Sequence, residues 1–298
     1  MEFKIEEKDG NIEVLARDGE KSAKATCFIN NTPKYEGKNI STIGNFETNN
    51  IELGVEILKK CEEIIKEKGF DFIVAPMNGN TWKKYRVLTY SSSEPNFILE
   101  NTDPIQHNEI LQKAGFEKLY TYTSTKGKIG DYVRSKYADV LGKKIKENKI
   151  TIRHFDKDNY LEDLKKIYSV IIQSFGRNPF YTSVKEEDFL KQYIPYFSIF
   201  DEDLILIAEK NNKAVGFLFT IPNLDKKSLV VKTGAVLPEY EKIALGSVIL
   251  DELQKKAKEK GYMEWIFAFM YQNNTSQKSA KRHNTKIIRE YALYAKKI

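Results

Sequence analysis

A dense group of polar and aromatic side chains follows a predicted strand over 71–77, where residues 76–86 are PMNGNTWKKYR. Trp82 and Tyr85 lie three residues apart, so they share one helical face and core packing is enough to explain them. Asn78, Asn80 and Arg86 are harder to explain by packing, because amides and a guanidinium hydrogen-bond readily to small ligands. We expect Asn78, Asn80, Trp82 and Arg86 to line a groove for a small ligand or to form a contact with a second domain.

The residues that usually bind metals or act as nucleophiles are few and scattered. Cys27 and Cys61 are the only cysteines and form no CxxC pattern, which predicts two reduced thiols and no disulfide. The histidines, at positions 107, 154 and 283, show no H-x-x-x-H spacing. We therefore expect no metal site.

Composition excludes several further classes of protein. The 298 residues are 41% hydrophobic and 30% charged, which is typical of a globular protein with sizeable cores. The net charge of +6 comes from Lys and Glu interleaved along predicted helices, and no basic run is paired with stacking aromatics, so we expect no nucleic-acid partner. No apolar run approaches a membrane span or a signal core, so we expect a cytoplasmic protein without a membrane partner.

The sequence contains a short internal repeat. This repeat marks the helices and strands that must position the polar groups. Residues 66–70 (KEKGF) end a predicted helix and lead into strand 71–77, while 258–262 (KEKGY) end another and lead into strand 263–270. Each strand is followed by an Asn-rich patch, NGN at 78–80 and QNNT at 272–275. Two related units are therefore predicted.

The first half is predicted to begin with antiparallel strands over 11–17, 22–30 and 39–47 and a helix over 50–68. After strand 71–77 we predict a helical turn that carries Trp82, Tyr85 and Arg86, a strand over 97–99, a helix over 107–114 and a strand over 119–124 that completes the unit. A charged helix over 132–148 then connects the halves.

The second half repeats this order and adds a pair of helices at its front. Its predicted elements are a strand over 150–155, helices over 161–175 and 186–196, strands over 204–209, 214–221 and 229–237, a helix over 244–260, a strand over 263–270, a polar helix, and a last strand over 287–295. We predict an α/β protein (an α+β mixed sheet) with two tandem domains, 1–128 and 149–298, joined by a helical linker over 129–148. Each domain is a mixed, mostly antiparallel sheet flanked by helices.

The stretch 236–247 (VLPEYEKIALGS), between a strand and the long helix, resembles the V-x-P-x-x-Q/R-x-x-G-x-G/A phosphate turn of the GNAT acyltransferases. With the element order, this resemblance implies tandem acyl-CoA N-acyltransferase (GNAT-like) domains and acetyl-CoA (coenzyme A) as cofactor. In such a turn small residues let backbone N–H groups approach a pyrophosphate at a helix N-terminus. Gly246 matches the last small position, Ala244 replaces a glycine, and Glu241 replaces Gln or Arg. The resemblance implies cofactor contacts from Ala235, Val236, Glu241, Lys242, Ala244, Leu245, Gly246 and Ser247.

The resemblance also implies roles around the strand after the long helix. Asn274, or Asn273, stands where the family's asparagine meets the pantetheine arm, although Asn is also a preferred helix cap. The family's tyrosine acid has no match, and Lys281 falls near its position, with Arg282 and His283 beside it. Glu264 is a candidate base if it faces the cleft, and otherwise an edge residue that faces solvent.

The loop over 175–181 stands where the family's first helices form a wall of the acceptor pocket. Arg177, with Asn178, could bind an anionic acceptor there, and the alternative is an ordinary loop between helices. In the first half, residues 43–50 (IGNFETNN) replace the phosphate turn and show no Q/R-x-x-G-x-G/A match, and Glu47 puts negative charge near the helix start. This copy is therefore not expected to bind acetyl-CoA. The string at 76–86 is similar to tandem GNAT-like bacterial proteins of unassigned substrate.

Three functions stay open at this point. The first is an N-acetyltransferase, a monomer or homodimer, whose second domain transfers the acetyl group of acetyl-CoA to an amine of a small molecule or peptide. The second is a non-catalytic GNAT-fold protein that binds a ligand or partner. The third is a transferase of a longer acyl or an aminoacyl group. The same fold occurs in enzymes that act on many different acceptors, so the fold does not identify the acceptor of this protein.

Overall fold

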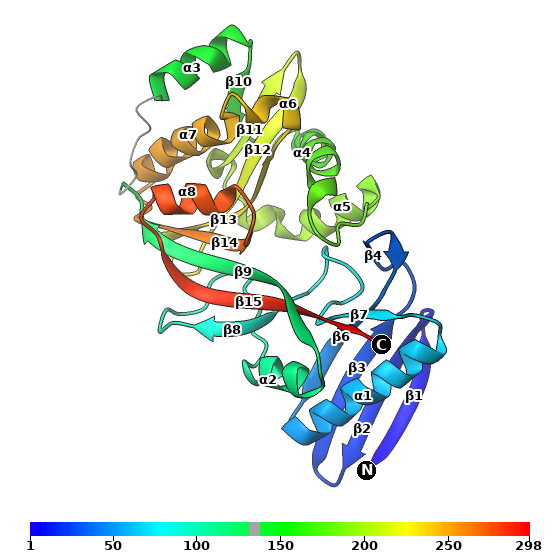
Figure 1. The fold of residues 1–298 in the computed structure, drawn as a ribbon. Helices are drawn as coiled ribbons and strands as arrows, with labels where there is room; N and C mark the ends of the chain where they lie inside the picture. Colours follow the sequence, from blue (N-terminus) through cyan, green and yellow to red (C-terminus); the bar gives the residue numbers. More distant parts are fainter. Residues whose placement is uncertain (131–137) are drawn as a thin grey trace.

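The computed structural model describes residues 1–130 and 138–298, and its two halves are joined in one long mixed sheet (Figure 1). Within those residues the sheet has 13 strands, and its main path runs β1-β2-β3-β6-β7-β15-β9-β14-β13-β12-β11-β10, with β8 paired to β15 beside it. Helices flank the sheet in both halves. The predicted fold class, an α/β protein with a mixed sheet, is confirmed.

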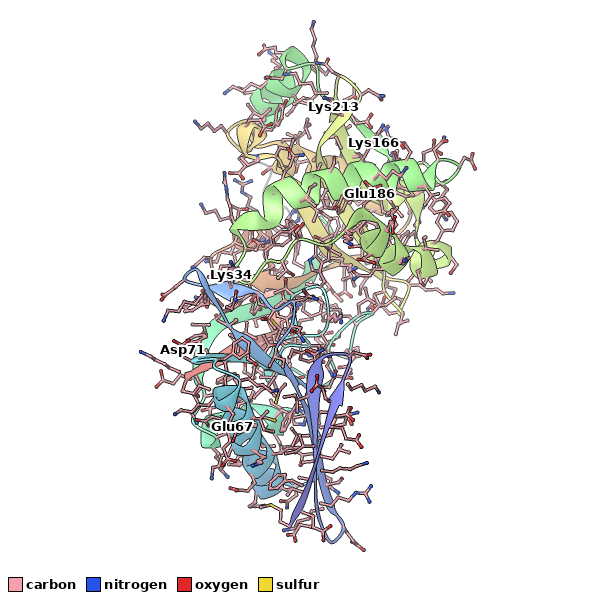
Figure 2. The ribbon with its side chains drawn as sticks, turned by 90° about the vertical axis from the view of Figure 1, so that its right-hand side faces the viewer. Lys34, Glu67, Asp71, Lys166, Glu186 and Lys213 are labelled. Carbon is pink, nitrogen blue, oxygen red and sulfur yellow. The ribbon has the colours of Figure 1, made fainter. Side chains whose placement is uncertain are left out.

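The first half follows the predicted order closely. Its elements are β1 (Glu2–Lys8), β2 (Asn11–Asp18), β3 (Lys21–Phe28), the small ribbon of β4 (Lys34–Tyr35) and β5 (Lys38–Asn39), β6 (Ser41–Thr48), α1 (Ile51–Glu67), β7 (Phe72–Ala75), β8 (Val87–Ser91), α2 (Gln106–Lys113) and β9 (Glu117–Lys128). The apolar face of α1 packs on β2, β3 and β6, where it buries Leu53, Ile57, Leu58, Cys61, Ile64 and Ile65. Figure 2 shows α1 lying along one face of these strands. Cys27 and Cys61 are buried free thiols.

Two local predictions in the first half are wrong. The predicted strand over 97–99 is a loop, in which the Phe97 N–H donates to the Glu100 carboxylate at 3.1 Å while the Phe97 ring is buried against β13 and β14. The apolar residues of that loop are therefore buried by packing rather than by strand pairing. The predicted helical turn with Trp82, Tyr85 and Arg86 is also irregular backbone, and β8 follows it directly.

The second half confirms the predicted order of the elements. They are β10 (Thr151–His154), α4 (Tyr160–Ser174), α5 (Glu186–Tyr193), β11 (Ile205–Lys210), β12 (Lys213–Pro222), β13 (Ser228–Val236), α6 (Pro238–Glu241), α7 (Leu245–Glu259), β14 (Glu264–Tyr271), α8 (Ser276–Arg282) and β15 (Lys286–Lys297), with short 3-10 helices η1 (Phe175–Arg177), η2 (Ile194–Ile199) and η3 (Glu202–Leu204). The connector helix predicted over 132–148 is represented by α3 (Ala138–Glu147), and residues 131–137 of the predicted linker lie outside the described residues.

The last strand of each half pairs with the other half. β15, at the end of the chain, lies between β7 and β9, with Tyr294 opposite Ala75, and β9 lies next to β14, with Thr123 opposite Met270. Figure 1 shows β9 and β15 running together between the halves. The sequence instead predicted that the strand over 119–124 completes the first unit. The division into 1–128 and 149–298 stays a prediction, and the sheet runs across it.

Candidate functional site

The two parallel strands of the second half separate partway along their length. β13 and β14 pair only from Ser228 opposite Glu264 to Val231 opposite Phe267. β13 then continues along β12 and β14 along β9, where a register shift between Phe267 and Met270 accompanies a positive φ of 54° at Phe269. We call the segments beyond this point, 232–236 and 268–271, the splay. Their facing backbone groups are not paired with each other, so an extended ligand chain could hydrogen-bond to them.

The turn after β13 leaves the start of α7 open. Ala244 precedes α7 with φ 54° and ψ 34°, the left-handed conformation that glycine adopts at least cost. This explains why the related turns carry a glycine there. A Cβ atom added at Gly246 would meet only Val236 Cγ2, at 3.5 Å, so packing within the chain does not require glycine at 246. The residue before α7 is Ala244, whose side chain makes no capping hydrogen bond to the helix.

Charged side chains gather around this turn. Ser247 accepts a hydrogen bond from Arg282 of α8, with 3.0 Å between Arg282 Nη1 and Ser247 Oγ. Arg177 Nη1 lies 3.8 Å from the Glu241 carboxylate, and both side chains are exposed. Lys242 is also exposed next to them. The anion that the sequence places beside the turn is therefore offset by Arg177, although an ion pair this exposed is weak.

The corresponding strands of the first half are closed by their own residues. β6 and β7 pair in parallel only at Ser41 with Ile73 and Thr42 with Val74. Beyond this point the Met77 N–H donates to the Ile43 carbonyl at 2.8 Å. Asn45 and Asn78 exchange two hydrogen bonds, from the Asn45 N–H at 2.8 Å and from Asn78 Nδ2 at 2.7 Å. These hydrogen bonds join β6 to the residues after β7, at the position where β13 and β14 separate in the second half.

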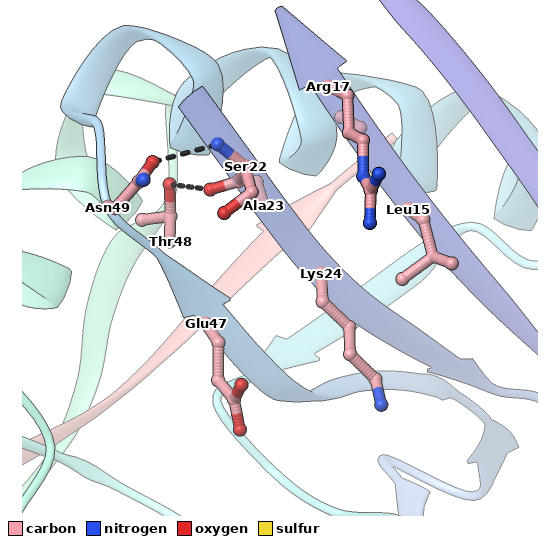
Figure 3. Close-up of a pocket in the computed structure, with 9 residues that line it drawn as sticks. Leu15, Arg17, Ser22, Ala23, Lys24, Glu47, Thr48 and Asn49 are labelled. Atoms are coloured by element: carbon pink, nitrogen blue, oxygen red, sulfur yellow. Dashed lines mark hydrogen bonds between the residues drawn. The ribbon is translucent and has the colours of Figure 1, made fainter. Parts of the chain in front are cut away.

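The turn before α1 is likewise satisfied within the chain. The Ser22 N–H donates to Asn49 Oδ1 at 2.8 Å and Thr48 Oγ1 donates to the Ser22 carbonyl at 3.1 Å (Figure 3). Asn50 caps α1, because its side chain accepts the Leu53 N–H at 2.9 Å. The N-terminus of α1 is therefore capped from within, while that of α7 is not.

The cluster at 76–86 joins the two halves. Asn80 Oδ1 accepts the Trp82 N–H at 3.0 Å, which fixes a local turn. Trp82 Nε1 donates to the Thr182 carbonyl at 2.8 Å, and its ring lies against Tyr181 and Phe189 of the second half. The structure therefore accounts for Asn78, Asn80 and Trp82 by contacts within the chain, and their predicted role in substrate binding stays a prediction.

Arg86 belongs to a different environment from the rest of that cluster. Its guanidinium carbon lies 4.2 Å, 4.9 Å and 4.3 Å from the ring centroids of Tyr85, Tyr122 and Phe269. Phe269 is a residue of the splay. The structure thus brings Arg86 to the second half's opening, although 183 positions separate Arg86 from Phe269 in the chain.

The residues predicted to act on and around α8 differ in burial and in their hydrogen-bond partners. Asn274 Oδ1 accepts the Ser276 N–H at 3.2 Å, which is the capping alternative. Lys281 is exposed in the last turn of α8. His283 is buried, and burial together with nearby Arg282 lowers its pKa from 6.5 to about 4. Gln277, which the sequence did not single out, donates from Nε2 to Thr123 Oγ1 at 2.9 Å and ties α8 to β9.

Glu264 lies at the paired end of β13 and β14, away from the splay. Its carboxylate is 3.0 Å from Lys126 Nζ, which also contacts Glu94 at 2.9 Å. Ser228 Oγ donates to Glu264 at 3.4 Å. The structure therefore does not bring Glu264 together with the turn. In the loop after η1, Asn178 is exposed and donates its backbone N–H to the Phe175 carbonyl at 2.8 Å.

Neither a metal centre nor a spanning helix is found in the parts of the chain that the structure describes. No group of three His, Cys, Asp or Glu residues within 1–130 and 138–298 could hold a metal ion. No helix in the same ranges is long and apolar enough to cross a membrane.

Comparison with known proteins identifies the part of the chain that contains this site. Residues 167–284 match the acetyltransferase (GNAT) family, and this segment runs from α4 through the splay and the turn to the end of α8. The second half therefore resembles a GNAT domain over the matched segment, which supports acyltransferase chemistry in general. No curated protein matches the chain.

Solved structures show the same fold along the whole chain. The chain is 13% identical, with a TM-score of 0.56, to a GCN5-related glucosamine N-acetyltransferase region in a fungal multi-domain GH3 beta-N-acetylglucosaminidase, over 96% of this chain but only 33% of that one. It is 13% identical, with a TM-score of 0.55, to a GCN5-related N-acetyltransferase from Sphaerobacter thermophilus, over 96% and 80% of the two chains. A tandem GNAT protein from the clavulanic acid pathway is 8% identical, with a TM-score of 0.50, over 96% and 82%. At these identities the likeness shows the tandem GNAT fold alone.

Proposed function

We propose that the protein is an N-acetyltransferase whose second half binds acetyl-CoA and whose substrate is an amine of a small molecule or peptide. The observation that carries the proposal is the separation of β13 and β14 after Val231 and Phe267, inside the segment that matches the GNAT family. The first half offers no equivalent opening, because Asn45 and Asn78 bridge it. One cofactor per chain follows.

The residues around the turn fit a coenzyme A molecule. Gly246 leaves open space beside the start of α7, and helix N-terminal N–H groups favour phosphate. Arg282 and Lys242 add positive charge near that helix end. Beyond Val231, the edge of β13 that faces away from β12 has no strand partner among the described residues, and we place the pantetheine arm along this edge. Ala235 and Val236 lie on this stretch, where the Val236 carbonyl accepts from Ser174 Oγ at 3.3 Å. The cofactor contacts predicted from the sequence are carried forward as part of this proposal.

When bound, the cofactor supplies the acetyl group as a thioester. We propose that an unpaired backbone N–H of the splay polarises the thioester carbonyl, as a donor in an oxyanion hole does. The Phe269 N–H is not that donor, because it is bonded to Ser124 Oγ at 3.1 Å. In the transfer a bond forms between the amine nitrogen and the acetyl carbon, the carbon–sulfur bond breaks, and the amine loses one proton while the sulfur gains one. Lys281, exposed on α8, stays the proposed donor to sulfur. Glu264 is too far along β14 to be carried forward as the base.

Isothermal titration of the protein with acetyl-CoA tests the proposal. We expect saturable binding with one site per chain, and we expect Gly246→Trp to abolish it without unfolding the protein, because the new side chain enters open space. The matched control is Gly142→Trp in α3, where an added Cβ meets no atom within 4 Å, compared with one ordinary contact at 3.5 Å for Gly246. Wild-type protein that fails to bind acetyl-CoA, or equal loss in both variants, would contradict the proposal.

The same titration separates the alternative functions. Binding of acetyl-CoA without release of free thiol from any amine tested indicates a non-catalytic binding protein. Binding of a longer acyl-CoA in clear preference to acetyl-CoA indicates a different acyl donor. Titration with both donors, followed by a thiol-release assay over a panel of amines, distinguishes these outcomes.

A further inference from the structure

Arg86 is a half-buried cation without a carboxylate partner among the described residues. Its guanidinium lies against the rings of Tyr85, Tyr122 and Phe269. The one side-chain hydrogen bond that it makes within the described part of the chain runs from Nη1 to the Tyr85 hydroxyl oxygen, at 3.2 Å. A guanidinium has five N–H donors, so most of the hydrogen-bonding capacity of Arg86 is unused.

The aromatic rings compensate the charge of Arg86 only in part. The faces of aromatic rings attract a cation weakly, while a buried charge in a protein is normally paired with an opposite charge. Glu100 is in the same region but is already engaged, since its carboxylate accepts from Arg289 Nε at 2.6 Å and from the Tyr291 hydroxyl at 3.1 Å. Arg86 therefore presents a net positive charge to whatever enters beside it.

The backbone holds Arg86 in place at a local cost. Arg86 has a positive φ of 67°, which is uncommon for a residue other than glycine and persists only where the surroundings enforce it. Its N–H donates to the Pro76 carbonyl and its own carbonyl accepts from Asn101 Nδ2, both at 2.9 Å. Two long-range hydrogen bonds thus fix the direction from which the side chain leaves the loop.

The position of Arg86 relates it to the proposed reaction. Phe269, one of its three rings, lies two residues past Phe267, the last residue of β14 that pairs with β13. A loop of the first half therefore delivers a positive charge to the β14 side of the splay. Positive charge that is fixed, partly desolvated and rich in free N–H donors is suited to bind a planar or tetrahedral anion.

We propose that Arg86 binds an acidic group of the acceptor, so that the acceptor is an amine that also carries a carboxylate or a phosphate. This inference rests on the proposed function, because it places the amine end of the same molecule at the splay. It gives the first half a role in the reaction, which is to supply the residue that selects the acceptor.

Matched pairs of amines test this inference. Each standard L-amino acid is compared with its carboxamide, and phosphoethanolamine with ethanolamine, by titration into protein saturated with coenzyme A and by thiol release with acetyl-CoA. We expect an acid to bind at least about 10-fold more tightly than its neutral partner, because hydrogen bonds to a charged group contribute about 1.5–3 kcal/mol. The two sets of pairs distinguish a carboxylate from a phosphate.

Variants at Arg86 test whether its side chain causes the preference for acidic amines. Arg86→Gln is expected to remove the preference for the acid while the affinity for acetyl-CoA is unchanged, and Arg86→Lys to restore part of the preference. Tyr85→Phe keeps the ring and should retain the preference, and Arg17→Gln in β2 controls for loss of a surface charge. The inference is overturned if no acid binds better than its neutral partner, or if Arg86→Gln weakens both members equally. Loss of acetyl-CoA binding in the wild type would instead overturn the proposed function.

Discussion

Ala244 gives a quantitative test of how the turn before α7 is built. Its φ of 54° and ψ of 34° place an alanine in the left-handed region, which costs about 1–2 kcal/mol for a residue with a Cβ atom. Glycine removes this cost but adds about 0.4–1 kcal/mol of backbone entropy to the unfolded state. The difference predicts that Ala244→Gly raises the free energy of unfolding by about 0.5–1 kcal/mol.

The assay is urea denaturation followed by circular dichroism, with Ala257→Gly as the matched control. Ala257 is fully buried in the last turn of α7, so the same substitution there loses a buried methyl group as well as helix propensity and is expected to lower the free energy of unfolding by about 1 kcal/mol or more. The opposite signs separate the turn conformation from the general effect of glycine. If Ala244→Gly destabilises the protein as Ala257→Gly does, the assigned conformation is wrong. We also expect Ala244→Gly to retain affinity for acetyl-CoA, since it restores the glycine found in related turns.

Two further predictions concern buried charge. Arg289 and Glu100 form an ion pair whose side chains are 1% and 2% exposed. Glu100→Ala leaves Arg289 buried without this partner, so it should lower the free energy of unfolding in urea by about 3–5 kcal/mol. A loss below about 1 kcal/mol would refute this prediction. His283 binds fewer protons folded than unfolded, because its pKa falls from 6.5 to about 4, so stability should decrease as the pH drops from 6.5 to 4, by up to about 3 kcal/mol. Unfolding free energies measured across that range should fall less steeply in His283→Leu, and an unchanged slope would show that His283 is not the group responsible.

The sequence predicted those features that depend on local pattern. The apolar spacing along α1 and α7 predicted both helices to within one residue at each end, and Ala244, Gly246 and Ser247 marked the turn that precedes α7. Periodicity works here because each helix buries one face, and only one phase of a 3.6-residue repeat does so.

Features that depend on distant partners were beyond the sequence. The residues of β9 and β15 do not show which half each strand joins, because the exchange is decided by pairing over the whole sheet. Likewise, the residue types of Asn78 and Arg86 indicated hydrogen-bonding capacity but not its use. Asn78 donates to Asn45, whereas most of the N–H donors of Arg86 make no hydrogen bond within the described part of the chain. Only the neighbours in the folded structure distinguish these two residues.

We propose that one of the two related halves binds the cofactor and that the other is closed to it. A crystal structure of the protein soaked with coenzyme A tests this asymmetry most directly. We predict density for one molecule per chain, with its pantetheine arm between β13 and β14 and its pyrophosphate beside Gly246, and an unchanged Asn45–Asn78 pair in the first half. Coenzyme A between β6 and β7, or in neither half at saturating concentration, would contradict the account.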